Sequence, residues 1–109
     1  MNVTQTKFGA VQIGIILLAV ATALIHILLA IPQNMIMFYL NGAGYLALTA
    51  ALFLPQLRPY RPLVRWALIG FAAVTVIGWA AIGERSTLAY VDKLIELALI
   101  ALVWMDARS

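Results

Sequence analysis

The sequence predicts an all-α protein: a four-helix transmembrane bundle of up-down-up-down topology, with both termini in the cytoplasm (N-in/C-in). The composition, four long apolar segments and the placement of basic residues all point to this fold. The 109 residues are 65% hydrophobic and 10% charged, whereas a soluble domain is about 45–50% apolar and about 25% charged. A soluble fold of this length has too little interior to hide so much apolar surface, and lipid would cover it instead. We therefore expect residues 1–109 to form a single integral membrane domain.

Each predicted span is an apolar segment bounded by proline, glycine or charged residues. A helix needs about 20 apolar residues to cross the bilayer. The segments of that length are 11–31, 35–54, 63–82 and 88–105. Pro32 is expected to end the first span and Pro55 the second, because proline cannot continue a helix. The third span is expected to open at Pro62 and to close before Gly83.

Lysine and arginine residues predict the orientation. Arg85 alone flanks one side of the predicted membrane, and five basic residues lie on the other. These five are Lys7, Arg58, Arg61, Arg65 and Arg108. Because basic loops stay in the cytoplasm, we expect a multi-pass protein of the plasma (inner) membrane of a prokaryote. The arginines of the second connection, Arg58, Arg61 and Arg65, are expected to contact lipid head groups.

Several function classes find no support in the sequence. The basic residues form no stripe with interleaved aromatics, so we expect no nucleic-acid partner. The absence of cysteine excludes disulfides, thiolate metal sites and thiol–disulfide exchange. No nucleophile–base pair, phosphate loop or GxSxG motif is present, so no catalytic residue is predicted and an enzyme is not expected. A single histidine and no specific ligand spacing predict no metal and no cofactor, with quinone or haem near His26 as a minor alternative.

Polar residues inside the predicted spans are the candidate functional residues, because intramembrane ionisable groups are costly. They are His26, Asn41, Asp92, Lys93 and Glu96. At 1.5 Å rise per residue they share a layer about 6 Å thick in the outer half of the membrane, and the inner half has no comparable set. Asp92 and Glu96 lie on one helix face and Lys93 can pair with either. We expect His26 to hydrogen-bond to a carboxyl group and Asn41 to bridge these residues, as ligand- or proton-handling candidates.

Three interpretations of this polar layer remain open. It can be an interhelical clamp that fixes helix register through mutual hydrogen bonds. It can be a site, open to the outer face, for a proton, a cation or the polar head of a lipid or quinone. It can also pair with polar residues of another subunit.

Aromatic and small residues suggest roles in the bundle itself. The aromatics near span ends are typical of an interfacial belt; they are Tyr39, Tyr45, Trp66, Tyr90 and Trp104. Trp79 lies where it could wall the polar layer. Small residues let helix backbones approach closely in membranes; those assigned to bundle packing are Ala19, Ala23, Ala30, Gly42, Gly44, Ala47, Gly70 and Gly78.

Three short segments carry a resemblance to known proteins. They are Leu24-Ile25-His26-Ile27-Leu28, the run from Phe38 to Leu46, and Val91-Asp92-Lys93-Leu94-Ile95-Glu96. Together they resemble a family of small, uncharacterised prokaryotic four-span membrane proteins. The resemblance covers most of the chain and implies no known activity. Size and span number are also similar to those of the small multidrug resistance transporters, but their essential carboxylate lies in the first span, which has no acid here.

The function expected from these observations is that of a non-catalytic subunit or accessory protein of a membrane complex or homo-oligomer. Its partners would be the lipid bilayer and other membrane subunits or itself. The alternative is a minimal proton-coupled transporter or small-ligand (lipid or quinone) carrier that uses the outer polar layer. In that case Glu96 or Asp92 would be the proton-coupled carboxylate and His26 a relay.

Overall fold

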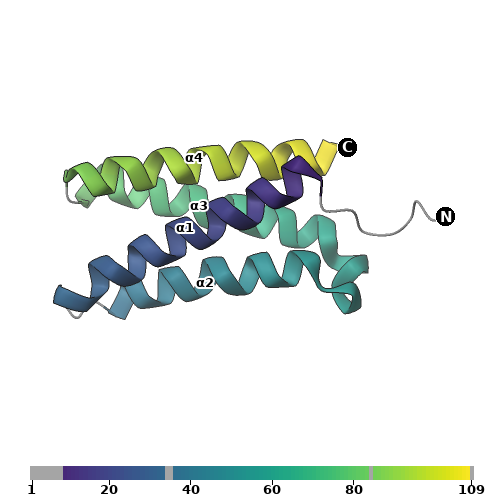
Figure 1. Ribbon diagram of the computed structural model, residues 1–109, viewed down its shortest axis with the longest axis horizontal. Helices are drawn as coiled ribbons and strands as arrows, with labels where there is room; N and C mark the ends of the chain where they lie inside the picture. Colours follow the sequence, from purple (N-terminus) through teal and green to yellow (C-terminus); the bar gives the residue numbers. More distant parts are fainter. Residues whose placement is uncertain (1–8, 34–35, 84, 109) are drawn as a thin grey trace.

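The structure is a computed structural model that describes residues 9–33, 36–83 and 85–108, and all regular secondary structure in these ranges is helical. Four α-helices and one short 3₁₀ helix follow one another along the chain: α1 (Ala10–Gln33), α2 (Ile36–Phe53), η1 (Pro55–Tyr60), α3 (Arg61–Ile82) and α4 (Thr87–Arg108). Consecutive α-helices run antiparallel, so the start of α1, η1 and the end of α4 lie at one end of the bundle (Figure 1). The predicted all-α class with four helices is confirmed.

Helix boundaries follow the predicted segments to within three residues. The prediction that Pro32 ends the first helix is wrong, because α1 continues to Gln33. Proline fixes φ near the helical value, so Pro32 can lie in the last turn of α1, at the cost of the one backbone hydrogen bond that its missing N–H would have donated. The proline-rich connection is also ordered: Pro55 begins η1, and the backbone N–H of Leu57 donates to the carbonyl of Leu54 at 3.1 Å.

Three helical segments of the described chain are long and apolar enough to cross a membrane, and they are Ala10–Ile31, Ile36–Phe53 and Pro55–Ile82. Helix α4 falls outside this set because its first half carries three charged residues, Asp92, Lys93 and Glu96. All three of these side chains are buried against the other helices. The outer surface is instead rich in large apolar side chains, including Leu63, Val74 and Ile82, which are 70%, 71% and 91% exposed.

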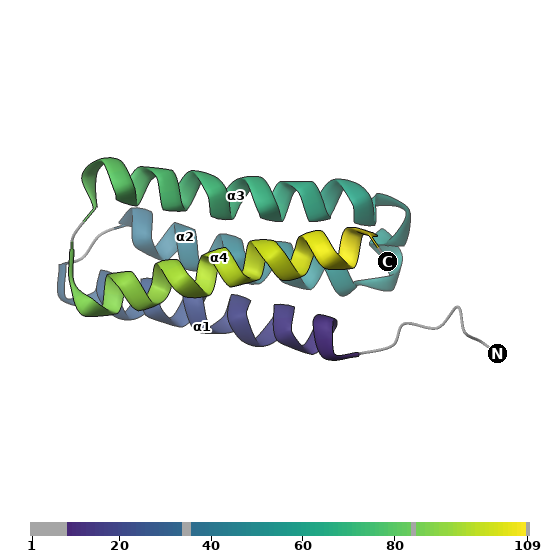
Figure 2. The ribbon, with the colours of Figure 1, turned by 90° about the horizontal axis from the view of Figure 1, so that it is seen from above.

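The helices pack as a ring in which α1 contacts α2 and α4, and α3 contacts the same two helices (Figures 1 and 2). Buried residues of α4 recur every three or four positions, as expected for a helix that faces a bundle interior; they include Ala89, Asp92, Glu96, Leu99, Val103 and Asp106. The buried hydrophobic core is formed by Ile15, Ala19, Ala23, Tyr45, Leu52, Leu68, Ala72, Leu99 and Val103.

Close helix approach is confirmed where α1 meets α2. A Cβ added to Gly42 would lie 2.9 Å from the backbone oxygen of Ala23, so only glycine permits this distance. The packing role predicted for Gly70 and Gly78 is not seen within this chain. Both are exposed on α3, and no described atom lies within 4 Å of a Cβ added at either position.

Candidate functional site

Four of the predicted site residues meet in the interior of the bundle. His26 projects from α1, while Asp92, Lys93 and Glu96 come from the inward face of α4. Their exposed fractions are only 4%, 1%, 7% and 0%. We call these four side chains the ionisable cluster. Because they are buried together, each charge depends on its neighbours in the cluster for stabilisation.

The ammonium group of Lys93 joins the two carboxylates. Its Nζ donates to Glu96 Oε1 at 2.6 Å and lies 3.2 Å from Asp92 Oδ2. The predicted pairing of Lys93 with a carboxylate is therefore confirmed, and it involves both acids. Lys93 is therefore shared by the two carboxylates.

His26 is held in one orientation by its own helix. Its Nδ1 lies 2.8 Å from the backbone oxygen of Thr22. Since a carbonyl oxygen only accepts hydrogen bonds, Nδ1 carries the hydrogen and donates it. The other ring nitrogen, Nε2, faces the two acids, at 3.5 Å from Asp92 Oδ2 and 3.8 Å from Glu96 Oε2.

Two further residues belong to the site and were not among the predicted set. The Thr22 hydroxyl lies 2.5 Å from Asp92 Oδ1 and donates to it, and the Tyr45 hydroxyl donates to Glu96 Oε2 at 2.6 Å. The assignment of Tyr45 to the interfacial belt is wrong, because its side chain is 0% exposed. Tyr45 lies near the middle of α2, three residues after Gly42 and four before Thr49, on the face that is buried. This helical spacing, rather than the residue type, could have indicated that Tyr45 faces the bundle interior.

Asn41 does not join the ionisable cluster. Its Nδ2 donates to Thr75 Oγ1 at 2.9 Å, and Thr75 in turn donates to the backbone oxygen of Phe71. The expectation that Asn41 bridges the ionisable residues is therefore wrong. Its Oδ1 is buried and accepts no hydrogen bond from the described residues. A buried amide oxygen without a hydrogen bond costs free energy, so a hydrogen-bond donor placed beside Asn41 Oδ1 would stabilise the protein.

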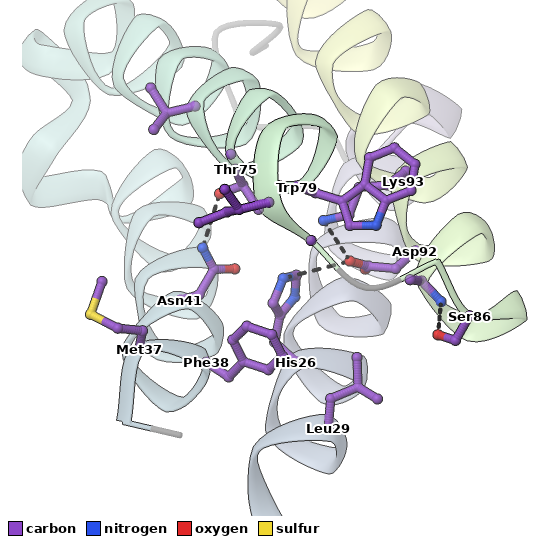
Figure 3. Close-up of a pocket in the computed structure, with 15 residues that line it drawn as sticks. His26, Leu29, Met37, Phe38, Asn41, Thr75, Trp79, Ser86, Asp92 and Lys93 are labelled. Carbon is purple, nitrogen blue, oxygen red and sulfur yellow. Dashed lines mark hydrogen bonds and ion pairs between the residues drawn. The ribbon is translucent and has the colours of Figure 1, made fainter. Parts of the chain in front are cut away.

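A cavity of about 250 Å³ separates Asn41 from the ionisable cluster. Figure 3 shows His26, Asp92 and Lys93 on one side of it, with Asn41 and Thr75 on the other. Its lining residues are mostly apolar: His26, Leu29, Met37, Phe38, Asn41, Val74, Thr75, Gly78, Trp79, Ile82, Gly83, Ser86, Ala89, Asp92 and Lys93. Trp79 lines this cavity as expected, and the Arg85 guanidinium lies 4.3 Å over its ring. A mostly apolar cavity with a few convergent polar groups is typical of a small-ligand site.

A second polar group, which the sequence did not predict, lies at the other end of the bundle. Asp106 of α4 accepts hydrogen bonds from Gln12 of α1 at 2.6 Å and from Arg65 of α3 at 2.8 Å. Arg61 donates to the backbone oxygen of Leu52, and Arg58 is exposed on η1. Arg61 and Arg65 thus have partners within the chain. Lipid head-group contact by these arginines stays a prediction, and Lys7 lies outside the described residues.

No protein-family model, curated protein or solved structure matches this chain. The resemblance to small prokaryotic four-span proteins therefore stays a prediction. Functional inference rests on the geometry of the ionisable cluster, its hydrogen-bond partners and the adjoining cavity.

Proposed function

We propose that this chain is a four-span integral membrane protein of a prokaryotic plasma membrane, with both termini in the cytoplasm. Its large exposed apolar side chains suit contact with lipid, and the charges of α4 are turned inward, where other side chains pair with them. Arg58, Arg61 and Arg65 cluster at the end of the bundle where α1 starts and α4 ends (Figure 1). That end is the cytoplasmic one if basic residues stay inside.

Cysteine labelling tests this orientation directly, because the natural chain has no cysteine. Gln56→Cys and Thr87→Cys place single thiols at exposed positions of opposite ends and leave every basic residue in place. In intact cells a membrane-impermeant maleimide should label Thr87→Cys, and it should reach Gln56→Cys only after the membrane is permeabilised. The reverse pattern would overturn the orientation, and equal labelling in intact cells would overturn four complete spans.

Within this membrane protein, we infer a binding site for a small amphipathic molecule, as a small-ligand carrier would have. The observation that carries the inference is the cavity of about 250 Å³, which Asn41 lines and beside which the Asn41 Oδ1 atom has no hydrogen-bond donor among the described residues. Phe38 and Trp79 supply an apolar surface for the body of the ligand, and a hydroxyl or amino group would satisfy Asn41. The volume is close to the lower limit of about 300 Å³ for ligand pockets, so the bound part is small, in the range of a lipid or quinol head group.

Two glycines of α3 provide a matched test of the cavity. Gly78 lines the cavity and Gly70 does not, yet neither has a described atom within 4 Å of an added Cβ. After gentle detergent extraction, native mass spectrometry should detect a small-molecule adduct on the wild type and on Gly70→Leu. The adduct should be lost from Gly78→Leu, whose side chain occupies cavity space. An adduct of equal occupancy in all three proteins would contradict the site.

The second candidate function is a non-catalytic subunit or accessory protein of a membrane complex or homo-oligomer. It is favoured by the pairing within the ionisable cluster, since Thr22, Tyr45 and Lys93 satisfy the two carboxylates and tie α1, α2 and α4 in one register. Such a cluster acts as a clamp that needs no ligand. The same native mass spectra distinguish the two functions. Larger membrane proteins in a fixed ratio, with no adduct, would establish the subunit.

A further inference from the structure

We propose that His26, Asp92 and Glu96 form a site for a divalent first-row transition metal ion. This goes beyond the small-ligand proposal, because the site can bind metal whether or not the cavity holds a ligand. One ligand atom from each residue lies within 4.8 Å of the others, and all three residues are buried. From His26 Nε2 the distances are 3.5 Å to Asp92 Oδ2 and 3.8 Å to Glu96 Oε2. Ligands about 2.1 Å from a tetrahedral ion lie about 3.4 Å apart. The two histidine–carboxylate distances need shifts of only a few tenths of an ångström. The two carboxylate oxygens, which lie within 4.8 Å of each other, must approach by up to about 1.4 Å.

The orientation of His26 is that of a metal ligand. Its Nδ1 hydrogen is donated to the backbone oxygen of Thr22 at 2.8 Å. In the neutral imidazole the lone pair is therefore on Nε2, and it points toward two carboxylate oxygens. His26 Nε2, Asp92 Oδ2 and Glu96 Oε2 are all hydrogen-bond acceptors and repel one another. A cation bound between them would be attracted to all three atoms. Metal-binding histidines commonly donate their second ring N–H to a backbone carbonyl in this way.

The carboxylates have supporting hydrogen bonds as well. Thr22 Oγ1 donates to Asp92 Oδ1, which leaves Oδ2 directed toward His26. Tyr45 donates to Glu96 Oε2 and holds that side chain in place. Such outer contacts fix the geometry of ligands before the ion binds. They come from α1 and α2, so the bundle itself orients the site.

One imidazole nitrogen and two carboxylate oxygens suit borderline divalent ions such as Zn²⁺, Mn²⁺, Fe²⁺ and Co²⁺. Three protein ligands leave at least one coordination position for water or another ligand, as in sites that act on a bound molecule. His26 and Asp92 also line the cavity, so an ion can reach the site from there. The sequence placed these three residues in one polar layer, but no ligand spacing pointed to a metal, because they come from the first and last helices.

The Lys93 ammonium would compete with the metal ion for the carboxylates of Asp92 and Glu96. Its Nζ lies 2.6 Å from Glu96 Oε1 and 3.2 Å from Asp92 Oδ2. A dication at His26 would repel this ammonium, and the adjoining cavity, which Lys93 also lines, gives the side chain room to move away. Removing the charge of Lys93 should therefore strengthen metal binding. A purely structural clamp predicts no metal affinity to strengthen.

Metal titration of the full-length protein in detergent tests the proposal, with a purification tag that contains no histidine. His26 is the only histidine and cysteine is absent, so a Co²⁺–imidazole absorption band can arise only at His26. We expect 1:1 binding of Co²⁺ by visible absorption and of Zn²⁺ by calorimetry. His26→Gln removes a direct ligand and should weaken binding by at least the roughly 10–100-fold that the loss of an outer-shell partner costs. Lys93→Gln should tighten it by about tenfold or more. Asp106→Asn, which alters a buried carboxylate at the other end of the bundle, should leave it unchanged.

Binding that survives in His26→Gln would overturn the site, as would the absence of Co²⁺ binding in both the wild type and Lys93→Gln. Circular dichroism and gel filtration establish that each variant is folded. If Lys93→Gln fails to fold, the comparison of wild type with His26→Gln decides by itself. Loss of the small-molecule adduct in Gly78→Leu with Co²⁺ binding retained would show that the two proposals stand separately.

Discussion

Replacing Glu96 with alanine is expected to lower the free energy of unfolding by about 3–5 kcal/mol, the cost of breaking a buried ion pair by removing one partner. Glu96 is 0% exposed and accepts hydrogen bonds from both Lys93 and Tyr45. Without it, the Lys93 ammonium keeps only Asp92 and the Tyr45 hydroxyl loses its acceptor. Denaturation of the purified protein in mixed detergent micelles, followed by circular dichroism, measures the change.

Two further variants test whether loss of the Lys93–Glu96 ion pair causes the decrease in the free energy of unfolding. The double substitution Glu96→Leu with Lys93→Met removes both partners and should recover much of the loss, because apolar replacements of a buried pair are often nearly neutral. Tyr45→Phe keeps the ring and removes one hydrogen bond, so it should cost about 0.6–2 kcal/mol in a membrane. A loss below about 1 kcal/mol for Glu96→Ala would mean that these groups are not paired in the bundle.

Replacing Gly42 with leucine should destabilise the bundle by about 1–3 kcal/mol, the usual cost of overpacking. The added Cβ alone would lie 2.9 Å from both the Ala23 backbone oxygen and Ile27 Cγ1. A backbone atom cannot move aside as a side-chain end can, so α1 and α2 must separate. The same denaturation assay gives the change in free energy.

Gly70→Leu is the matched control, since it makes the same substitution on an exposed helix face. It should be neutral or slightly stabilising, because glycine costs a helix up to about 1 kcal/mol. If the two variants shift the stability equally, then close approach of α1 and α2 does not explain the glycine at position 42.

The fold was largely predictable from composition and from the length of the apolar segments. Apolar segments of span length gave α1 to α4 with their order and antiparallel arrangement, and the helix boundaries differ from the expected ones by at most three residues. Span prediction needs only local information, because each helix satisfies its own backbone and each apolar run is contiguous.

The candidate site was only partly predictable. His26, Asp92, Lys93 and Glu96 stood out because charge is rare in such a sequence, and the structure brings these four together. Thr22 and Tyr45 did not stand out, since threonine and tyrosine are common in membrane helices. Their roles depend on which face of α1 and α2 is turned inward, and that follows from packing between helices.

The sequence by itself determined the helical class, the number of helices and that His26, Asp92, Lys93 and Glu96 gather at one level of the bundle. Those properties depend on the composition of contiguous segments and on the rise of a helix. Only the tertiary structure decided that His26 Nε2 faces both carboxylates, that Tyr45 is an interior donor and that Asn41 stands across a cavity from the cluster. These relations join α1, α2, α3 and α4 across the bundle, and the rotation of each helix about its axis is set by its neighbours rather than by its own residues.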